Sequence, residues 1–441
     1  MSVLAVALFA AWGVVLLILL GLLAAQFLTL RQGVLVRRWT PADRDAPAAP
    51  DDWPSVCVVI PARNEAREIG RCLEAVLAQD YPKLSVLVVD DRSEDDTAAI
   101  VREHARRDPR LRLETVDSLP PGWLGKSHAL WLGTRGVTAD WILFLDADCR
   151  LDPAAVRSVI AQALRKGAEL VSLWPRQAAG SFWEHMLIPL CAGTLALRFR
   201  PGRVNRAGGR DAFANGAFLL IRRAAYERIG GHREVRTALI EDIPLAELAK
   251  RRGVPCWVGS GRDVFCVRMY DSFRAIVSGW ARIYVGAFRS GVQIVLSIAW
   301  LLAGSLLPFV AAAALAIDAL LAPPGTRGPD AEALRRTAAA FCAAHLLLAL
   351  AVTYVFWGFG RSPRRYLLLY PVSVVLVIAI LARAWWWLIV KRSIPWRDRR
   401  YPINRSGVIT MPAEPAAGPE TGASPGSVGL VLTEVPDRAA G

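Results

Sequence analysis

The sequence predicts an α/β domain with a mostly parallel sheet, held to a membrane by apolar helices. Strand and helix patterns alternate between residues 55 and 145, an order that is typical of open parallel sheets. Residues 3–30 carry no charge and are long enough to cross a bilayer. Further apolar blocks lie at about 292–322, 337–357 and 366–390. The chain of 441 residues is therefore predicted to be a membrane protein with a polar middle region.

The N-terminal segment, residues 1–30, is predicted to be an uncleaved transmembrane anchor. It is too long for a cleaved signal peptide, and Arg31, Arg37 and Arg38 follow the apolar run instead of preceding it. Basic residues at this end place the following domain on the cytoplasmic side by the positive-inside rule. Residues 31–53, which include "PADRDAPAAPDDWP", are predicted to be a linker.

The elements of the domain follow from apolar periodicity. In order they are a strand at 55–60, a helix at 65–79, a strand at 84–90, a helix at 93–105, a strand at 111–116, a helix near 127–135 and a strand at 141–145. Ser93 is the predicted N-cap of the second helix. Because ligands bind at the carboxyl ends of such strands, "PARNE", "DDRSEDD" and "DAD" are expected on one rim.

Two aspartates directly follow the last of these strands. Asp146 and Asp148 are separated only by Ala147, and a tight turn there brings both carboxylates near one point. Such hard oxygen ligands suit Mg²⁺ or Mn²⁺, with substrate phosphates and water completing the coordination. The alternative is a solvated turn whose acids cap the next helix.

Three more groups on this rim have a functional and a structural interpretation. Asp90 and Asp91 can accept hydrogen bonds from a base or a ribose, or can shape the turn. Lys126 lies in a Gly/Pro-rich loop and suits a phosphate, or is a surface lysine at a helix start. A helix at 238–253 begins near Glu241, with Asp242 in its first turn as a general base or as ordinary N-terminal acid enrichment.

Several classes of protein are disfavoured. Neither a dinucleotide fingerprint nor a P-loop occurs. The net charge is +14, but no basic patch is interleaved with aromatic residues, so nucleic acid is not an expected partner. The basic flanks instead suit anionic membrane lipids. The seven cysteines occur singly without CxxC, which disfavours a zinc or disulfide framework and fits a reducing compartment.

The order of motifs carries a more specific resemblance. "VVIPARNE", "VVDDRSEDDT", "GWLGK", "FLDADC", "NGAFLLIRR", "GGH" and "EDIPLA" resemble the inverting family-2 glycosyltransferases with a GT-A fold, over about residues 54–285. Within that family the chain looks most like membrane-anchored bacterial enzymes that glycosylate lipids, including hopanoid-associated and carotenoid glycosyltransferases.

The expected organisation combines this resemblance with the apolar pattern. A GT-A domain for a nucleotide-diphospho-sugar is expected at 54–267 and an interfacial amphipathic segment at 268–290. A transmembrane region follows at 291–390, and then a basic and finally disordered tail at 391–441.

The resemblance implies a role for each matching residue. The implied contacts with a UDP- or GDP-sugar come from Pro61, Ala62, Arg63, Asn64, Glu65, Asp90, Asp91, Lys126 and Asp146. Asp146 and Asp148 would hold Mn²⁺ or Mg²⁺, and Asp242 would deprotonate the acceptor hydroxyl. The implied acceptor side comprises Asn215, Gly216, Glu241 and Trp280.

One departure from the family affects the product. Processive members carry Gln-x-x-Arg-Trp, whereas this chain has Ile276, Gly279 and Trp280 at the corresponding positions. Transfer of one sugar to a lipid or other small membrane-associated acceptor, at the cytoplasmic face of a bacterial cytoplasmic membrane, is therefore expected. A processive polysaccharide synthase and a catalytically silent membrane scaffold remain the alternatives.

The topology of the C-terminal blocks is left open by the sequence. Three full spans would place the tail outside, yet 391–405 contains six basic residues. The block at 292–322 contains Pro308 and Asp318, so it is the one expected to be kinked or re-entrant.

Overall fold

The computed structural model describes residues 3–31, 36, 38, 52–206, 208–321, 328–359, 362–396, 399–405 and 407–410. Most of the predicted linker at 31–53 and the predicted disordered tail from 411 onward lie outside these residues.

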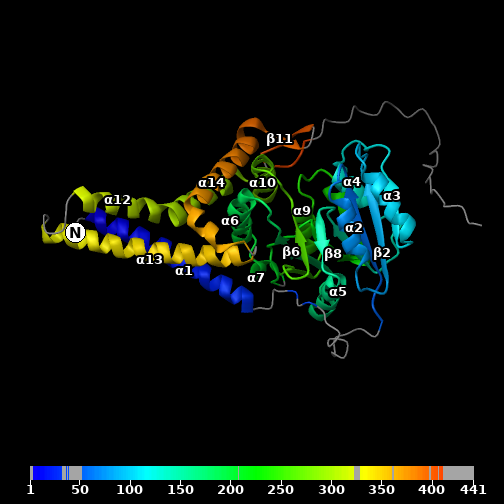
Figure 1. The fold of residues 1–441 in the computed structure, drawn as a ribbon, viewed down its shortest axis with the longest axis horizontal. Coiled ribbons are helices and arrows are strands. Elements are labelled where there is room, and N and C mark those ends of the chain that lie inside the picture. The colour runs from blue at the N-terminus through cyan, green and yellow to red at the C-terminus, as the bar shows by residue number, and fades with distance from the viewer. Residues whose placement is uncertain are drawn as a thin grey trace, which may run out of the picture. The chain divides into compact units, whose positions relative to one another are not determined.

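A seven-stranded sheet forms the centre of the α/β domain, in the order β3-β2-β1-β4-β8-β6-β9 (Figure 1). Its strands are β1 (Val56–Ala62), β2 (Leu84–Asp90), β3 (Leu111–Thr115), β4 (Trp141–Leu145), β6 (Leu170–Trp174), β8 (Phe218–Arg222) and β9 (Cys256–Ser260). Neighbours run parallel except β8, which is antiparallel to both β4 and β6. The predicted mostly parallel sheet is therefore confirmed.

Helices cover both faces of this sheet. They are α2 (Ile69–Leu77), α3 (Thr97–Arg107), α4 (Gly125–Leu132), α5 (Ala155–Lys166), α7 (Pro201–Val204), α8 (Arg223–Arg228), the 3₁₀ segment η2 (Gly231–Val235) and α9 (Asp242–Arg251). Alternate residues of β1 enter different cores, because side chains of a strand alternate between its faces. Val58 packs with Leu73 of α2, and Val59 packs with Leu130 of α4.

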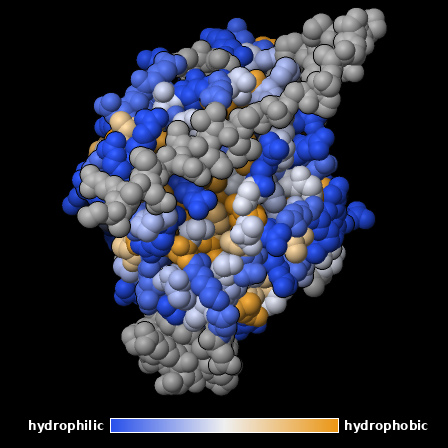
Figure 2. Space-filling view, turned by 90° about the vertical axis from the view of Figure 1, so that its right-hand side faces the viewer, coloured by the Kyte–Doolittle hydropathy of each residue, from blue (hydrophilic) through white to orange (hydrophobic). Residues whose placement is uncertain are grey.

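A three-stranded sheet adjoins the central one, in the order β5-β10-β7. Its strands are β5 (Cys149–Leu151), β7 (Arg176–Gln177) and β10 (Phe265–Val267). Two longer helices then leave the domain, α6 (Phe182–Arg198) and α10 (Phe273–Phe288). The face of the catalytic domain shown in Figure 2 is mostly hydrophilic, with hydrophobic residues visible in a recess near its centre.

The first two helices begin later than the sequence predicts. Helix α2 begins at Ile69 and not near 65, because the backbone N–H groups before it donate to the loop after β2: that of Glu65 lies 2.8 Å from Thr97 Oγ1. Helix α3 begins at Thr97 with Asp96 as its N-cap. The predicted N-cap, Ser93, is wrong, since its hydroxyl donates to Asp90 and accepts from the backbone of Asn64.

Four helical stretches within the described residues are long and apolar enough to cross a membrane: Val6–Ala24, Gly291–Leu321, Pro329–Val355 and Arg364–Lys391. They belong to α1 (Val3–Arg31), α11 (Gly291–Leu301) with η3 (Leu302–Leu306) and α12 (Leu307–Leu321), α13 (Pro329–Phe359), and η4 (Arg364–Leu369) with α14 (Tyr370–Trp385) and η5 (Trp386–Lys391). This agrees with a membrane protein.

The stretch from 291 to 321 is interrupted once, as Pro308 predicts. A π-helical turn, η3, separates α11 from α12, since proline has no N–H to donate and crowds the preceding turn. Helix α13 begins before the apolar block at 337, because Glu332 forms ion pairs with Arg335 and Arg336 that extend the helix on its polar end.

Helix α14 follows a different course from α1, α12 and α13. It packs against α6, α10 and α11. At its start, the Tyr370 hydroxyl donates to Ser305 of η3 at 2.8 Å. In η5, which continues α14, Ile389 lies against Gly291, where an added Cβ would be 2.7 Å from the isoleucine side chain. Helix α14 therefore runs antiparallel to α11 and returns toward the catalytic domain.

The basic segment after α14 is more ordered than the sequence suggests. Strands β11 (Ser393–Trp396) and β12 (Arg399–Pro402) pair antiparallel as a hairpin. Beyond it, the backbone at Gly407 approaches α10, where an added Cβ would lie 3.1 Å from the Val285 carbonyl oxygen. The hairpin region is thus held next to a helix of the catalytic domain.

Candidate active site

The carboxyl ends of β1, β2 and β4 lie side by side and carry the three predicted loops. Pro61 and Ala62 end β1, Asp90 ends β2, and Asp146 follows β4 directly. The first two loops are joined by the backbone, since the N–H of Asp91 donates to the carbonyl of Ala62 at 2.8 Å. The parallel register thus places all three loops at one edge.

The loops after β1 and β2 are locked together by an asparagine and an arginine with left-handed backbones. Asn64 has φ 52° and Arg92 has φ 56°, a region that favours glycine and asparagine. The Asn64 Oδ1 atom accepts from the backbone N–H of Glu94 at 2.8 Å. Both loops are therefore preorganised, and polar atoms of 61–65 face those of 90–96.

Asp91 is buried under the first turn of α4, which carries Lys126. Its carboxylate accepts from Arg92 Nε at 2.9 Å, and Arg63 lies 3.9 Å away. A Cβ added at Gly125 would lie 2.1 Å from Asp91 Oδ2, so a side chain at 125 would displace the carboxylate. The glycine in "GWLGK" is thus required for this close approach.

Lys126 joins two of the predicted acids. Its ammonium lies 2.8 Å from Asp146 Oδ1 and 2.9 Å from Glu241 Oε1. A Cβ added at Gly216 would lie 3.2 Å from Glu241 and 3.3 Å from both Asp242 and Lys126. Residues from four separate parts of the sequence, 126, 146, 216 and 241–242, therefore meet at one point.

Asp242 stands at the N-terminus of α9, as its position in the sequence predicts. Its carboxylate accepts from the backbone N–H of Gly216 at 2.6 Å and of Ile243 at 2.7 Å. Burial, with the neighbouring Glu241, raises the pKa of Asp242 in spite of these donors and of Lys126. Its side chain is thus held in one orientation and has a raised affinity for a proton.

The charges of this cluster are not balanced. Burial and the nearby Asp146 and Glu65 raise the pKa of Asp148. Although burial opposes it, the carboxylates of Asp146 and Glu241 raise the pKa of Lys126 well above its ordinary value. One ammonium thus faces several carboxylates, and the pKa of Asp148 marks negative charge that the protein itself does not neutralise.

This donor set fits a divalent cation that brings further ligands with it. No group of three or more His, Cys, Asp or Glu placed to hold a metal occurs in the described part of the chain. Asp146 and Asp148 supply two hard oxygen donors and excess negative charge, which Mg²⁺ and Mn²⁺ favour. A cation here would complete its coordination with substrate oxygens and water.

The residues expected on the acceptor side come from three parts of the chain: the turn before β8, the start of α9, and α10. Gly216 and Glu241 belong to the cluster around Lys126. The Asn215 side chain shapes the turn into β8, since its Oδ1 accepts from the N–H of Ala217 at 3.0 Å. Trp280 is buried within α10 and packs on Tyr284, with ring centroids 5.8 Å apart.

Tyr270 explains why the processive pattern is absent from α10. A Cβ added at Gly279 would lie 2.1 Å from the Tyr270 ring, so the tyrosine occupies the space that an arginine side chain at 279 would need. Burial raises the pKa of Tyr270, Arg282 opposes this, and Asp148 contributes to it, which places the phenol near both. The sequence analysis did not identify Tyr270.

An ion pair between a buried glutamate and an exposed arginine at the start of α6 was also missed. Glu184 is fully buried and accepts from Arg268 Nε at 2.9 Å and from a second guanidinium nitrogen at 3.1 Å. Ser181 caps α6, and its hydroxyl accepts from the Glu184 N–H at 3.3 Å. The capping-box pattern "SFWE" is the signal that could have revealed this helix start.

The α/β domain, with paired carboxylates and a lysine at the carboxyl edge of its sheet, agrees with the GT-A fold that the motifs predict. Residues 57–230 match the model of Glycosyl transferase family 2. This match supports the family that the motifs predict.

Known relatives and solved structures share parts of the chain. The 4,4′-diaponeurosporenoate glycosyltransferase of Staphylococcus haemolyticus (strain JCSC1435) is 27% identical over 259 residues, 58% of this chain and 68% of that protein. The protein of the same name from Staphylococcus aureus (strain MRSA252) is 28% identical over 261 residues, 57% of this chain and 67% of that one. The mannosyltransferase PcManGT of Pyrobaculum calidifontis, solved with GDP-Man and Mn²⁺, has a TM-score of 0.49 at 22% identity, covering 87% of this chain and 98% of that one.

Proposed function

We propose that this chain is a membrane-bound inverting glycosyltransferase that moves one sugar from a UDP- or GDP-sugar to a lipid acceptor. The observation that carries the proposal is the meeting of Lys126, Asp146, Glu241 and Asp242 around Gly216. A catalytically silent scaffold would have no need for an uncompensated acidic cluster beside a half-buried lysine, because removing charge from water is costly.

The donor side follows from the joined loops of β1 and β2. Asp90 and Asp91, with Pro61 to Glu65, form the polar wall at which a nucleoside would bind, and Lys126 would meet the diphosphate. Asp146 and Asp148 would hold Mn²⁺ or Mg²⁺, and the cation would neutralise charge on the leaving diphosphate.

Asp242 is the proposed general base. Backbone N–H groups fix its carboxylate, and its raised pKa favours taking a proton from an attacking acceptor hydroxyl. The acceptor oxygen then displaces the diphosphate directly at the anomeric carbon. One displacement inverts the anomeric configuration and requires no covalent enzyme intermediate.

The relatives' names make the acceptor chemistry testable. A diaponeurosporenoate is a carboxylate and already ionised near neutral pH, whereas a lipid alcohol needs a base. We therefore propose testing Asp242→Asn with Mn²⁺ and both kinds of acceptor. Transfer to the alcohol should fall about a hundredfold or more, and transfer to the carboxylate less than tenfold.

The control for this experiment is Asp117→Asn, at an exposed position outside the cluster. Unchanged transfer to a lipid alcohol by Asp242→Asn would contradict the proposed base. Wild-type protein that turns over neither UDP- nor GDP-sugars with any acceptor would favour the silent scaffold. Products longer than one added sugar would favour the processive synthase, against which Gly279 argues.

The proposed location is the cytoplasmic membrane, with the catalytic domain on the cytoplasmic side. Helices α1, α11–α12 and α13 would each cross the bilayer once. Because α14 returns along α11 to the domain, the basic residues of 391–405 would stay on the cytoplasmic side, as the positive-inside rule requires. Labelling of a cysteine placed at Ser393 from the outside of intact cells would contradict this arrangement.

A further inference from the structure

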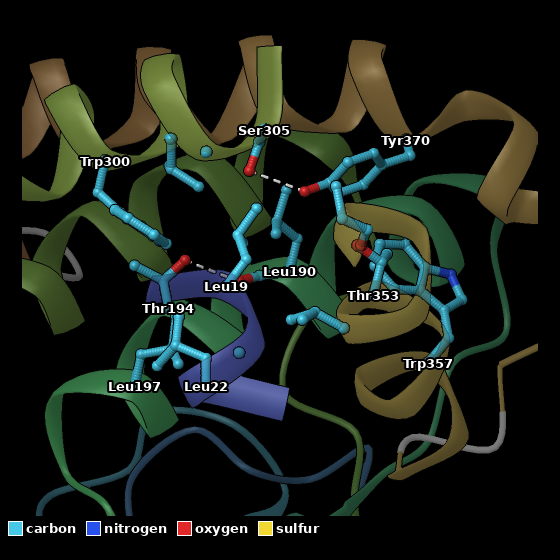
Figure 3. A pocket seen from close by; sticks show the side chains of 15 residues that line it. Leu19, Leu22, Leu190, Thr194, Leu197, Trp300, Ser305, Thr353, Trp357 and Tyr370 are labelled. Atoms are coloured by element: carbon cyan, nitrogen blue, oxygen red, sulfur yellow. Dashed lines mark hydrogen bonds between the residues drawn. The ribbon is translucent and has the colours of Figure 1, made fainter. Parts of the chain in front are cut away.

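A cavity of about 40 Å³ lies among the membrane helices, where α1, α6, α11, η3, α13 and α14 meet (Figure 3). Helix α6 belongs to the catalytic domain, and it supplies Leu190, Gly193, Thr194 and Leu197 to the lining. The cavity is thus lined both by the apolar helices and by a helix that starts at the catalytic domain.

The lining presents an apolar surface. It contains no charged side chain, and the buried indole Nε1 of Trp357 has no hydrogen-bond partner within the described residues. The Tyr370 hydroxyl donates to Ser305 at 2.8 Å (Figure 3), Thr194 donates to the Leu190 carbonyl at 2.9 Å, and Thr353 donates to the Ala349 carbonyl at 2.7 Å. A hydrocarbon chain suits such a wall better than a polar headgroup.

The level of the cavity along α13 suits an acceptor held near the membrane surface. Thr353 and Trp357 lie in the last turns of the apolar block 337–357, on the domain side of α13. Arg364 lies over the ring of Tyr354, with 3.4 Å between its guanidinium carbon and the ring centroid, and donates to the Tyr354 carbonyl at 3.1 Å. A basic residue and an aromatic residue at this level are typical of the membrane–water interface.

Helix α6 connects this level with the catalytic site. Its first turn is fixed by the ion pair of the buried Glu184 with Arg268, and Arg268 precedes Tyr270 by two residues. Leu190 lies about 9 Å further along α6 and Leu197 about 20 Å, at a rise of about 1.5 Å per residue. A long lipid could therefore have its chain beside α6 and its polar end at the domain.

Resting on the proposed function, we propose that this cavity receives the hydrocarbon chain of the lipid acceptor and so selects long-chain over short-chain acceptors. The π-turn η3 widens the helix here and lets the Trp300 ring lie on Gly304, with an added Cβ at 3.1 Å. Such turns occur frequently at functional sites. Entry of a chain would require side chains at the cavity wall to move apart.

The test uses the full-length protein in lipid nanodiscs and a C16 fatty acid that carries a diazirine. Photolabelled peptides are mapped by mass spectrometry, with 4,4′-diaponeurosporenoate as competitor. Ala349→Phe fills the cavity from α13, and Ala343→Phe is the matched control, because Ala343 is exposed on the same helix. Val352→Leu is a milder filling variant in case Ala349→Phe fails to fold.

We expect labelling of the cavity segments of α6 and α13 in wild type and in Ala343→Phe. Both filling variants should reduce it, Ala349→Phe about tenfold. The KM for a long-chain acceptor should rise about tenfold, while the KM for the nucleotide sugar and for a short-chain acceptor stays unchanged. Equal labelling of folded filling variants, or displacement of the probe by phospholipid as readily as by the carotenoid, would overturn the proposal.

The two proposals fail in different ways. Cavity labelling that the filling variants abolish, without sugar transfer by the wild type, would refute the proposed function and leave the hydrocarbon site standing. Sugar transfer with an unchanged long-chain KM in the filling variants would refute the hydrocarbon site alone.

Discussion

The cluster around Lys126 and the cavity beside Thr194 differ in how their polar groups are paired. In the catalytic cluster, carboxylates outnumber the ammonium, and the pKa values of Asp148 and Asp242 are raised. In the membrane cavity, the hydroxyls are paired within the protein and none of the lining residues carries a charge. The first region carries excess negative charge that a bound cation would neutralise, whereas the second offers a mainly apolar surface with one unpaired indole N–H among the described residues.

The largest expected effect is at Asp148. Replacing it by asparagine removes a proposed cation ligand, so turnover with Mn²⁺ should fall about a thousandfold. The same change removes a carboxylate whose raised pKa shows that its charge destabilises the folded protein at neutral pH. Thermal unfolding in metal-free buffer should therefore be unchanged or shift upward, as is common for functional sites.

Asp117→Asn, at an exposed position, should change neither quantity. Full Mn²⁺-dependent turnover by Asp148→Asn would contradict the proposal that Asp148 binds a cation in the cluster around Lys126. A lowered melting temperature would show that Asp148 is structural.

The sequence predicts the electrostatic region much better than the apolar one. Asp146, Lys126 and Asp242 stand at strand ends and helix starts, where local patterns fix the position of a side chain. The cavity depends on six elements that are far apart in the sequence, and Gly193 or Ser305 has no local pattern that marks it. The course of α14 was also not predictable, because it depends on packing against α11. A helix that crosses the membrane and a helix that returns to the domain can have the same hydropathy, so hydropathy does not distinguish them.

The departures in the predicted region have the same cause. Ser93 looked like an N-cap because a serine precedes acids, but a contact with Asn64, 29 residues away, takes its hydroxyl. Tyr270 was not predicted because its ring packs on Gly279, which is close to it only in the folded structure. Tertiary contacts override the local signal in both cases.

The second prediction concerns the boundary between the two regions, at Gly279 of α10. In Gly279→Ala the new methyl group would overlap the half-buried Tyr270 ring, which should lower the free energy of unfolding by about 2 kcal/mol. Gly70→Ala, in α2, is the matched control: its added Cβ is 3.6 Å from Ile100, and the change should be neutral or slightly stabilising.

A double-mutant cycle identifies the cause. Once Tyr270→Ala has removed the ring, adding Gly279→Ala should cost little, so the two effects should not be additive. Denaturant unfolding of all four proteins in detergent gives the coupling. Additive losses would mean that the ring does not set the requirement for glycine, and the account of the missing processive pattern would then be wrong.

The smallest expected effect is on the pH dependence of the free energy of unfolding, which should involve the cluster region and not the cavity. His232, behind the catalytic cluster, is buried against Phe144, and burial with nearby Lys126 lowers its pKa to about 3. The unfolded chain takes up a proton near pH 6.5 that the folded protein excludes, so stability is lost as the pH falls from about 6.5 toward 3. Between pH 7 and 5.5 the loss attributable to His232 should be about 1 kcal/mol.

His232→Gln, which can still bond the Tyr226 hydroxyl, should flatten this part of the profile, whereas Ala349→Phe in the uncharged cavity should leave its slope unchanged. If the cavity variant altered the slope as much as His232→Gln, the separation between a titrating pocket and a non-titrating cavity would not hold.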